Sequence, residues 1–133
     1  MSATRSADVR TAVEGCRIED ATPVSLDADA IGSTAPDHLR ELKREFVADD
    51  LVPARVVVDA CFGEDCSFAT QQEADRVREY VRAAAFLGAN TVTVEFDSVA
   101  DESKVRPALA ALAERAHREG VAFEVTGPVA LAD

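Results

Sequence analysis

The side chains in this sequence that could bind a ligand or a metal ion fall mainly where predicted strands end. The carboxylates and the thiol follow apolar runs, and the histidine stands at the start of a predicted helix; the group comprises Asp59, Cys61, Glu95, Asp97, Glu124 and His38. Ligands of parallel sheets bind beyond the carboxyl ends of the strands. The spacing therefore predicts a ligand site at that edge, for a partner protein or a small molecule.

Three of these carboxylates, Asp59, Glu95 and Glu124, have the chemistry of a divalent cation site. Carboxylate oxygens are hard ligands of the kind that Mg²⁺ and Ca²⁺ prefer. No compact motif such as an EF-hand loop accompanies them, and a solvated polar face would account for the same residues. A bound divalent cation is therefore one of two interpretations of this group.

The cysteines suggest two further hypotheses. Cys61 with His38 would supply a nucleophile and its base, whereas a buried Cys61 would be an inert part of the core. Cys61 and Cys66, in a C-x₄-C spacing, would form a redox pair or bind a soft metal. The chain has three cysteines and no C-x-x-C pair, which is typical of a reducing cytosol rather than of a disulfide scaffold.

Common catalytic motifs are absent from the sequence. It contains no G-x-G-x-x-G, no P-loop, no H-E-x-x-H and no G-x-S-x-G, so nucleotide cofactors and the common hydrolase mechanisms have no support. The sequence favours a binding or interaction module. The alternative is a small metal-dependent enzyme.

Strand and helix patterns alternate along the chain. Helical spacing marks residues 37–49, a long helix capped by Thr70 and stopped by Gly88, and a third helix that begins at Asp101 or Ser103 and stops at Gly120. Extended segments are expected at 13–19, 23–26, 55–62, 90–97 and 121–126, with a loop at 27–36 and a flexible tail at 1–12. This order predicts one α/β domain over residues 13–133. Its core is a four-stranded, mainly parallel sheet with right-handed crossovers, and segment 13–19 is an additional N-terminal strand.

The last two strands each have one apolar and one polar face. In residues 90–97, valines and a phenylalanine alternate with threonines and carboxylates, and residues 121–126 show the same alternation. A sheet covered by helices on both faces would be apolar throughout. We therefore expect all helices on one face, and a polar face that is open, lines a cavity or meets a partner. A homodimer is the simplest cover for that face and for the two sheet edges.

The chain is strongly acidic. Its 25 acidic residues exceed 14 basic ones, which gives a net charge of −11, and Lys43 and Lys104 are the only lysines. Such a chain repels nucleic acid phosphate and anionic membrane surfaces, and no apolar run approaches the roughly 20 residues of a membrane span. No secretory signal opens the sequence. The composition resembles that of cytosolic proteins from halophilic archaea, and the chain resembles a small protein of that kind. In such proteins, solvated carboxylates keep the molecules dispersed in concentrated salt.

Three segments carry a further resemblance. Glu73–Asp97, EADRVREYVRAAAFLGANTVTVEFD, is similar to the helix, A-x-x-L-G-A and strand unit of the sugar phosphate isomerase and endonuclease IV superfamily, which includes xylose isomerase-like barrels. Val105–Glu124 resembles the following unit and Leu39–Cys61 the preceding one. The resemblance implies about half of a (β/α)₈ barrel. It also implies that Glu95 and Glu124 stand where metal-dependent members carry ligands, although no strand end here supplies a histidine.

Overall fold

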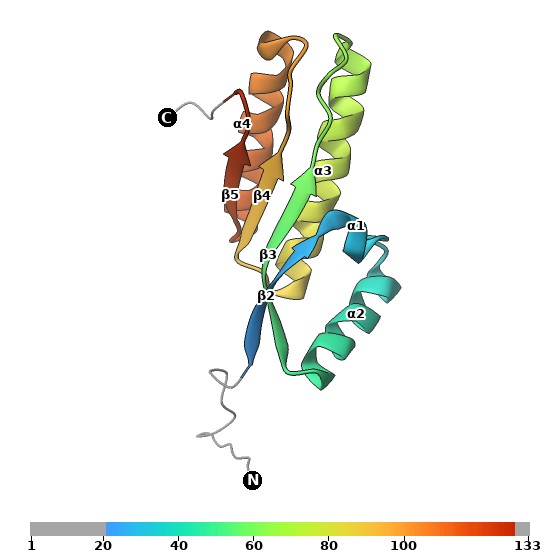
Figure 1. The fold of residues 1–133 in the computed structure, drawn as a ribbon. Coiled ribbons are helices and arrows are strands. Elements are labelled where there is room, and N and C mark those ends of the chain that lie inside the picture. The colour runs from blue at the N-terminus through green and yellow to red at the C-terminus, as the bar shows by residue number, and fades with distance from the viewer. Residues whose placement is uncertain (1–20, 130–133) are drawn as a thin grey trace.

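The described part of the chain is built around four parallel strands that lie side by side in their chain order, β2-β3-β4-β5 (Figure 1). A computed structural model describes residues 21–129. The strands are β2 (Thr22–Asp27), β3 (Leu51–Asp59), β4 (Thr91–Glu95) and β5 (Ala122–Thr126). The helices are α1 (Ala28–Ile31), α2 (Pro36–Ala48), α3 (Ser67–Leu87) and α4 (Glu102–Arg118). This confirms the predicted parallel α/β sheet.

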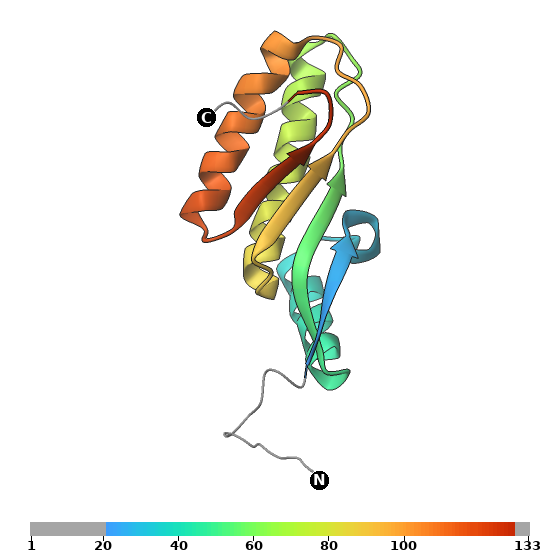
Figure 2. The same cartoon turned by 60° about the vertical axis from the view of Figure 1, so that its left-hand side comes forward.

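All three long helices cover the same face of the sheet. Figure 2 shows the strands in front and the helices behind them, with the front face bare. Beneath the helices lie the valines of the two central strands, Val56, Val58, Val92 and Val94, each with no exposed surface. Burial of one such side chain stabilises the fold by about 1.5–3 kcal/mol. The predicted arrangement, with helices on one face and a polar open face, is therefore confirmed.

The ends of two helices show which local signals decide a boundary. The carboxylate of Asp101 accepts a hydrogen bond of 2.9 Å from the N–H of Ser103 and so caps α4. The prediction that α3 begins at Thr70 was wrong. The N–H of Thr70 already donates to the carbonyl of Cys66, so Cys66 is the capping residue and Thr70 belongs to the first turn. Gly88 ends α3 in the left-handed conformation, as expected.

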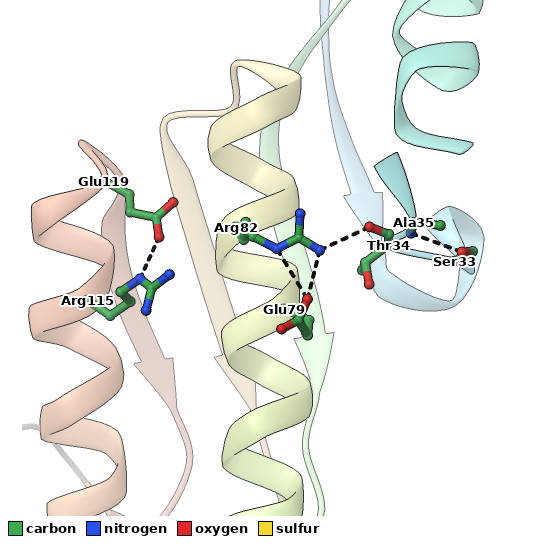
Figure 3. A network of polar contacts seen from close by, with 7 residues as sticks. All are labelled: Ser33, Thr34, Ala35, Glu79, Arg82, Arg115 and Glu119. Atoms are coloured by element: carbon green, nitrogen blue, oxygen red, sulfur yellow. Dashed lines mark hydrogen bonds and ion pairs between the residues drawn. The ribbon is translucent and has the colours of Figure 1, made fainter. Parts of the chain in front are cut away.

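The predicted loop 27–36 contains the short helix α1. Figure 3 shows how the segment after α1 is attached to α3, through the guanidinium of Arg82, which donates to the carbonyl of Thr34 and to the carboxylate of Glu79. The hydroxyl of Tyr80 donates to the carbonyl of Gly32 at 2.8 Å. These contacts join residues 48 positions apart, so local sequence patterns could not predict them.

Strand β3 lies earlier in the chain than the predicted segment 55–62. It includes the buried Pro53, and its register with β2 shifts by one residue between Pro53 and Arg55. The strand ends at Asp59, and the N–H of Ala60 then donates to the carbonyl of Glu95. Phe62 keeps one isolated bridge to Val99.

The expected tail 1–12 and the expected strand 13–19 lie outside the described residues. Within residues 21–129, the search for a helix long and apolar enough to cross a membrane found none.

Candidate functional site

A polar cluster crosses three strands at the centre of the open sheet face. The Nη1 atom of Arg55 on β3 donates to Thr93 Oγ1 on β4 and to Glu124 Oε1 on β5, at 2.7 Å each. The hydroxyl of Thr93 also donates to Glu124 Oε1, at 3.1 Å. Thr93 is only 5% exposed, because the two charged side chains on either side of it cover it. The three side chains therefore hydrogen-bond to one another, and the positive and negative charges of the cluster cancel.

Beyond this cluster, carboxylates gather at the carboxyl ends of the strands. Asp59 and Glu95 are register partners on β3 and β4, and Thr126 on β5 lies beside Glu95. Asp27, at the end of β2, lines a small hollow of about 50 Å³ together with Asp59 and Val57. This edge is therefore acidic, whereas the centre of the face is neutral.

The three carboxylates considered as cation ligands do not form one group. Asp59 and Glu95 are neighbours, but Glu124 pairs in register with Thr93 and binds Arg55. Within the described part of the chain, no three His, Cys, Asp or Glu side chains stand close enough together to hold a metal ion. The geometry of a single copy therefore gives the cation hypothesis no support.

A second polar group lies between the end of β3 and the start of α3. The carboxylate of Glu73 accepts hydrogen bonds from the N–H of Cys61 at 2.8 Å and from two guanidinium nitrogens of Arg76. Burial alone would raise the pKa of Glu73, but these hydrogen bonds and the Arg76 charge hold that pKa below its usual value. Arg76 also donates to the carbonyl of Asp59. The pair lines a cavity of about 320 Å³ together with Cys61, Phe62, Glu64, Ala69, Thr70 and Gln72.

The structure separates the remaining predicted residues. Cys61 and Cys66 are both exposed free thiols, and Cys61 shares a hollow of about 260 Å³ with Asp97. The Nε2 atom of His38 lies 2.7 Å from the carbonyl of Ile31, so this ring ties α2 to the end of α1. Within residues 21–129 no hydrogen bond joins His38 to Cys61, and the nucleophile and redox hypotheses stay predictions.

Sequence reasoning missed the residues that carry most of the contacts at these sites. Arg55 is the only basic residue in the four described strands, and its alternation with Val57 and Asp59 was a signal for the open face. Thr93 lies on the polar face that the alternation predicted. The contacts of Glu73 and Arg76 had no comparable signal, because their position over the end of β3 depends on how the helix packs.

Comparisons with known proteins agree with this fold. A family model described as "Domain of unknown function (DUF8564)" matches residues 20–125. No curated protein matches the sequence. Among solved structures, the chain is similar to a xylose isomerase domain protein from Planctomyces limnophilus, with a TM-score of 0.60 and 12% identity. The match covers 88% of this chain and 49% of that chain, so this protein spans about half the length of that structure.

Proposed function

The chain belongs to the family described as a domain of unknown function (DUF8564), and from this premise we propose that it is an interaction module that works as a homodimer. The open polar face of the sheet is the interacting surface, and a second copy covers it. The acidic, lysine-poor composition supports a cytosol of concentrated salt as the setting.

The observation that carries this proposal is the polar network on the open face of the sheet. Helices cover one side of the sheet, and the other side carries a closed polar network of Arg55, Thr93 and Glu124 beside the half-buried Val57. Covering a charged group is costly when it loses its hydrogen-bond partner. Here each charge already has its partner, so this part of the face can lie against another protein surface without leaving an unpaired ion.

An enzymatic function has less support. The Glu73 carboxylate, at the hollow of about 320 Å³ near the end of β3, is engaged with Arg76 and a backbone N–H. The carboxylates of the described sheet do not converge on one metal position. Because the likeness to the xylose isomerase domain protein is at 12% identity, it supports the fold and carries no activity to this chain.

Light scattering after gel filtration in molar KCl tests the proposal. Val57→Arg places a long charged side chain on the open face, and Ala111→Arg places the same side chain on the exposed surface of α4. We expect the mass of two chains for the unaltered protein and for Ala111→Arg, and dissociation at least about tenfold stronger for Val57→Arg. Circular dichroism confirms that both variants are folded.

Two results would contradict the proposal. One is a monomeric mass for the unaltered protein at every concentration up to about 1 mM, a weak limit for protein association. The other is a Val57→Arg variant, folded as judged by circular dichroism, that dimerises as tightly as Ala111→Arg.

A further inference from the structure

We infer that the second copy covers the sheet face by completing a closed barrel of eight parallel strands. In this arrangement the outer edge of β5 in each copy pairs with the outer edge of β2 in the other, about a two-fold axis that runs along the barrel. No strand within the described residues 21–129 pairs with either of these edges. The inference rests on the proposed function and specifies how the two copies meet.

The first support is the shape of the fold. A (β/α)₈ barrel consists of eight parallel strands in chain order with all helices outside. Residues 21–129 of this chain form four parallel strands in chain order, with the long helices on one face. The solved xylose isomerase domain protein, matched at a TM-score of 0.60 over 88% of this chain and 49% of its own, has a fold of which this chain resembles about half. Two copies related by a two-fold axis would supply the other half.

The second support is the chemistry of the two edges. The N–H of Ala122 donates to Asn90 and the carbonyl of Thr126 accepts from Phe96, so these residues face β4. Because successive residues of a strand face opposite sides, the N–H and carbonyl groups of Phe123 and Val125 face outward. The outer edge of β5 therefore presents backbone donors and acceptors that no strand within residues 21–129 pairs.

The edge of β2 offers matching groups. The N–H of Thr22 donates to the carbonyl of Asp50, so Thr22 faces β3, and the groups of Pro23 and Ser25 face outward by the same alternation. Pro23 has no N–H to lose from the sheet, which is why proline is tolerated at this edge position. The edge provides the carbonyl of Pro23 and both backbone groups of Ser25. A parallel strand such as β5 of the second copy can bind them.

The third support is the order of the side chains that would line the barrel. Barrel interiors are filled by layers of side chains, and the neutral Arg55–Thr93–Glu124 cluster lies at mid-height on the open face. The carboxylates of Asp59 and Glu95 lie at the strand ends, where a barrel opens to solvent. The acidic groups would therefore form a hydrated rim to which both copies contribute.

Amide hydrogen exchange measured by NMR in molar KCl, on the full chain at concentrations where light scattering gives its mass, tests the inference. The N–H groups of Ser25, Phe123 and Val125 point away from the neighbouring strand of the same sheet, and those of Thr22 and Ala122 are bonded within that sheet. In a closed barrel we expect the three outward amides to exchange at least about a hundredfold more slowly than in an open sheet. The amides of Thr22 and Ala122 are the internal reference.

A matched pair of variants tests the same edge. Ser25→Pro removes the outward N–H of an exposed residue, and Ser25→Ala removes the hydroxyl while keeping that N–H. We expect Ser25→Pro to weaken the dimer at least about tenfold relative to Ser25→Ala, through the lost N–H and the changed edge. Unchanged exchange at Thr22 and Ala122 would show that the variant sheet is intact.

The outcomes separate the two proposals. A dimer whose outward amides are protected and which Ser25→Pro weakens supports the barrel. A dimer whose outward amides exchange freely overturns the barrel and leaves the proposed dimeric module standing. A monomer overturns both. Protection of the outward amides in a monomer would instead show that another segment of the same chain occupies the edges.

Discussion

The ion pair between Arg55 and Glu124 should change in energetic weight when the open face is covered. The two side chains are 43% and 52% exposed in a single copy, with Nη1 and Oε1 2.7 Å apart. At such exposure a pair contributes about 0.2–1 kcal/mol, since water and salt screen it. In a covered face, removing one partner strands the other charge, at a cost of about 3–5 kcal/mol. The expected coupling energy therefore rises from below about 1 kcal/mol in the monomer to above about 2 kcal/mol in the dimer.

A double-mutant cycle measures this change. The variants are Arg55→Ala, Glu124→Ala and the double variant, unfolded by guanidinium chloride at about 1 µM and about 500 µM chain, which brackets a micromolar dimer. The control is the pair of Arg78 and Asp75 on α3, whose side chains are 45% and 48% exposed. Its coupling should stay below about 1 kcal/mol at both concentrations.

The cycle can refute the reasoning in two ways. The coupling between Arg55 and Glu124 could stay the same at both concentrations although the mass doubles, which would show that the face remains in water. The coupling of the control pair could rise equally, which would show that the increase comes from the unfolding conditions rather than from burial of the sheet face.

Three further predictions concern the single copy and one concerns the dimer. Glu73→Gln should lower the free energy of unfolding by about 1–3 kcal/mol at pH 7, because hydrogen bonds to a charged group are lost. Since the folded pKa of Glu73 lies below its usual value, the difference from the unaltered protein should disappear as the pH falls through that folded pKa; a pH-independent difference in chemical unfolding would contradict this. Leu109→Ala should lower the unfolding free energy by about 2–5 kcal/mol, since Leu109 has no exposed surface, and a loss below about 1 kcal/mol would mean that the core is looser than described. Gly127→Ala should lower the melting temperature, because an added Cβ would lie 2.7 Å from the carbonyl oxygen of Phe96; an unchanged melting curve would count against that close approach. Dimer affinity measured by light scattering should rise between about 0.1 M and about 1 M KCl, because salt screens repulsion between two chains of charge −11, and weaker association at high salt would point to attractive charge contacts instead.

Local patterns predicted the sheet because the residues that mark its strands and helix starts lie within a few positions of one another in the sequence. The alternation in residues 90–97 and 121–126 predicted both strands and their polar faces, although β4 ends at Glu95, two residues earlier than expected. Asp101 marked the start of α4 through a contact only two residues long. The position of β3 was less well predicted: the expected segment began at residue 55, whereas proline is uncommon inside strands and the strand begins before Pro53. In the structure Pro53 lies inside the strand, at the point where the register with β2 shifts.

The candidate site could be predicted only in part. The alternation placed Glu95 and Glu124 on one face correctly, but whether two carboxylates meet depends on how neighbouring strands are staggered. Glu124 lies beside Thr93, and Arg55 reaches it across 69 positions of chain. The contact of Glu73 with the N–H of Cys61 likewise depends on where α3 docks. The stagger of the strands and the position of α3 both follow from tertiary packing, so no local sequence pattern predicts them.

Pro23 has a consequence for how newly made chains avoid faulty assembly. A bare strand edge is a template on which unrelated strands, including those of partly folded neighbours in a crowded cell, can add and start an aggregate. At Pro23 the outward edge of β2 has a carbonyl but no N–H, so an uninterrupted ladder cannot form there. A stray strand thus gains less from this edge than from one with a full set of donors. Pro23 would therefore lower the risk that a single copy aggregates before it meets a second copy.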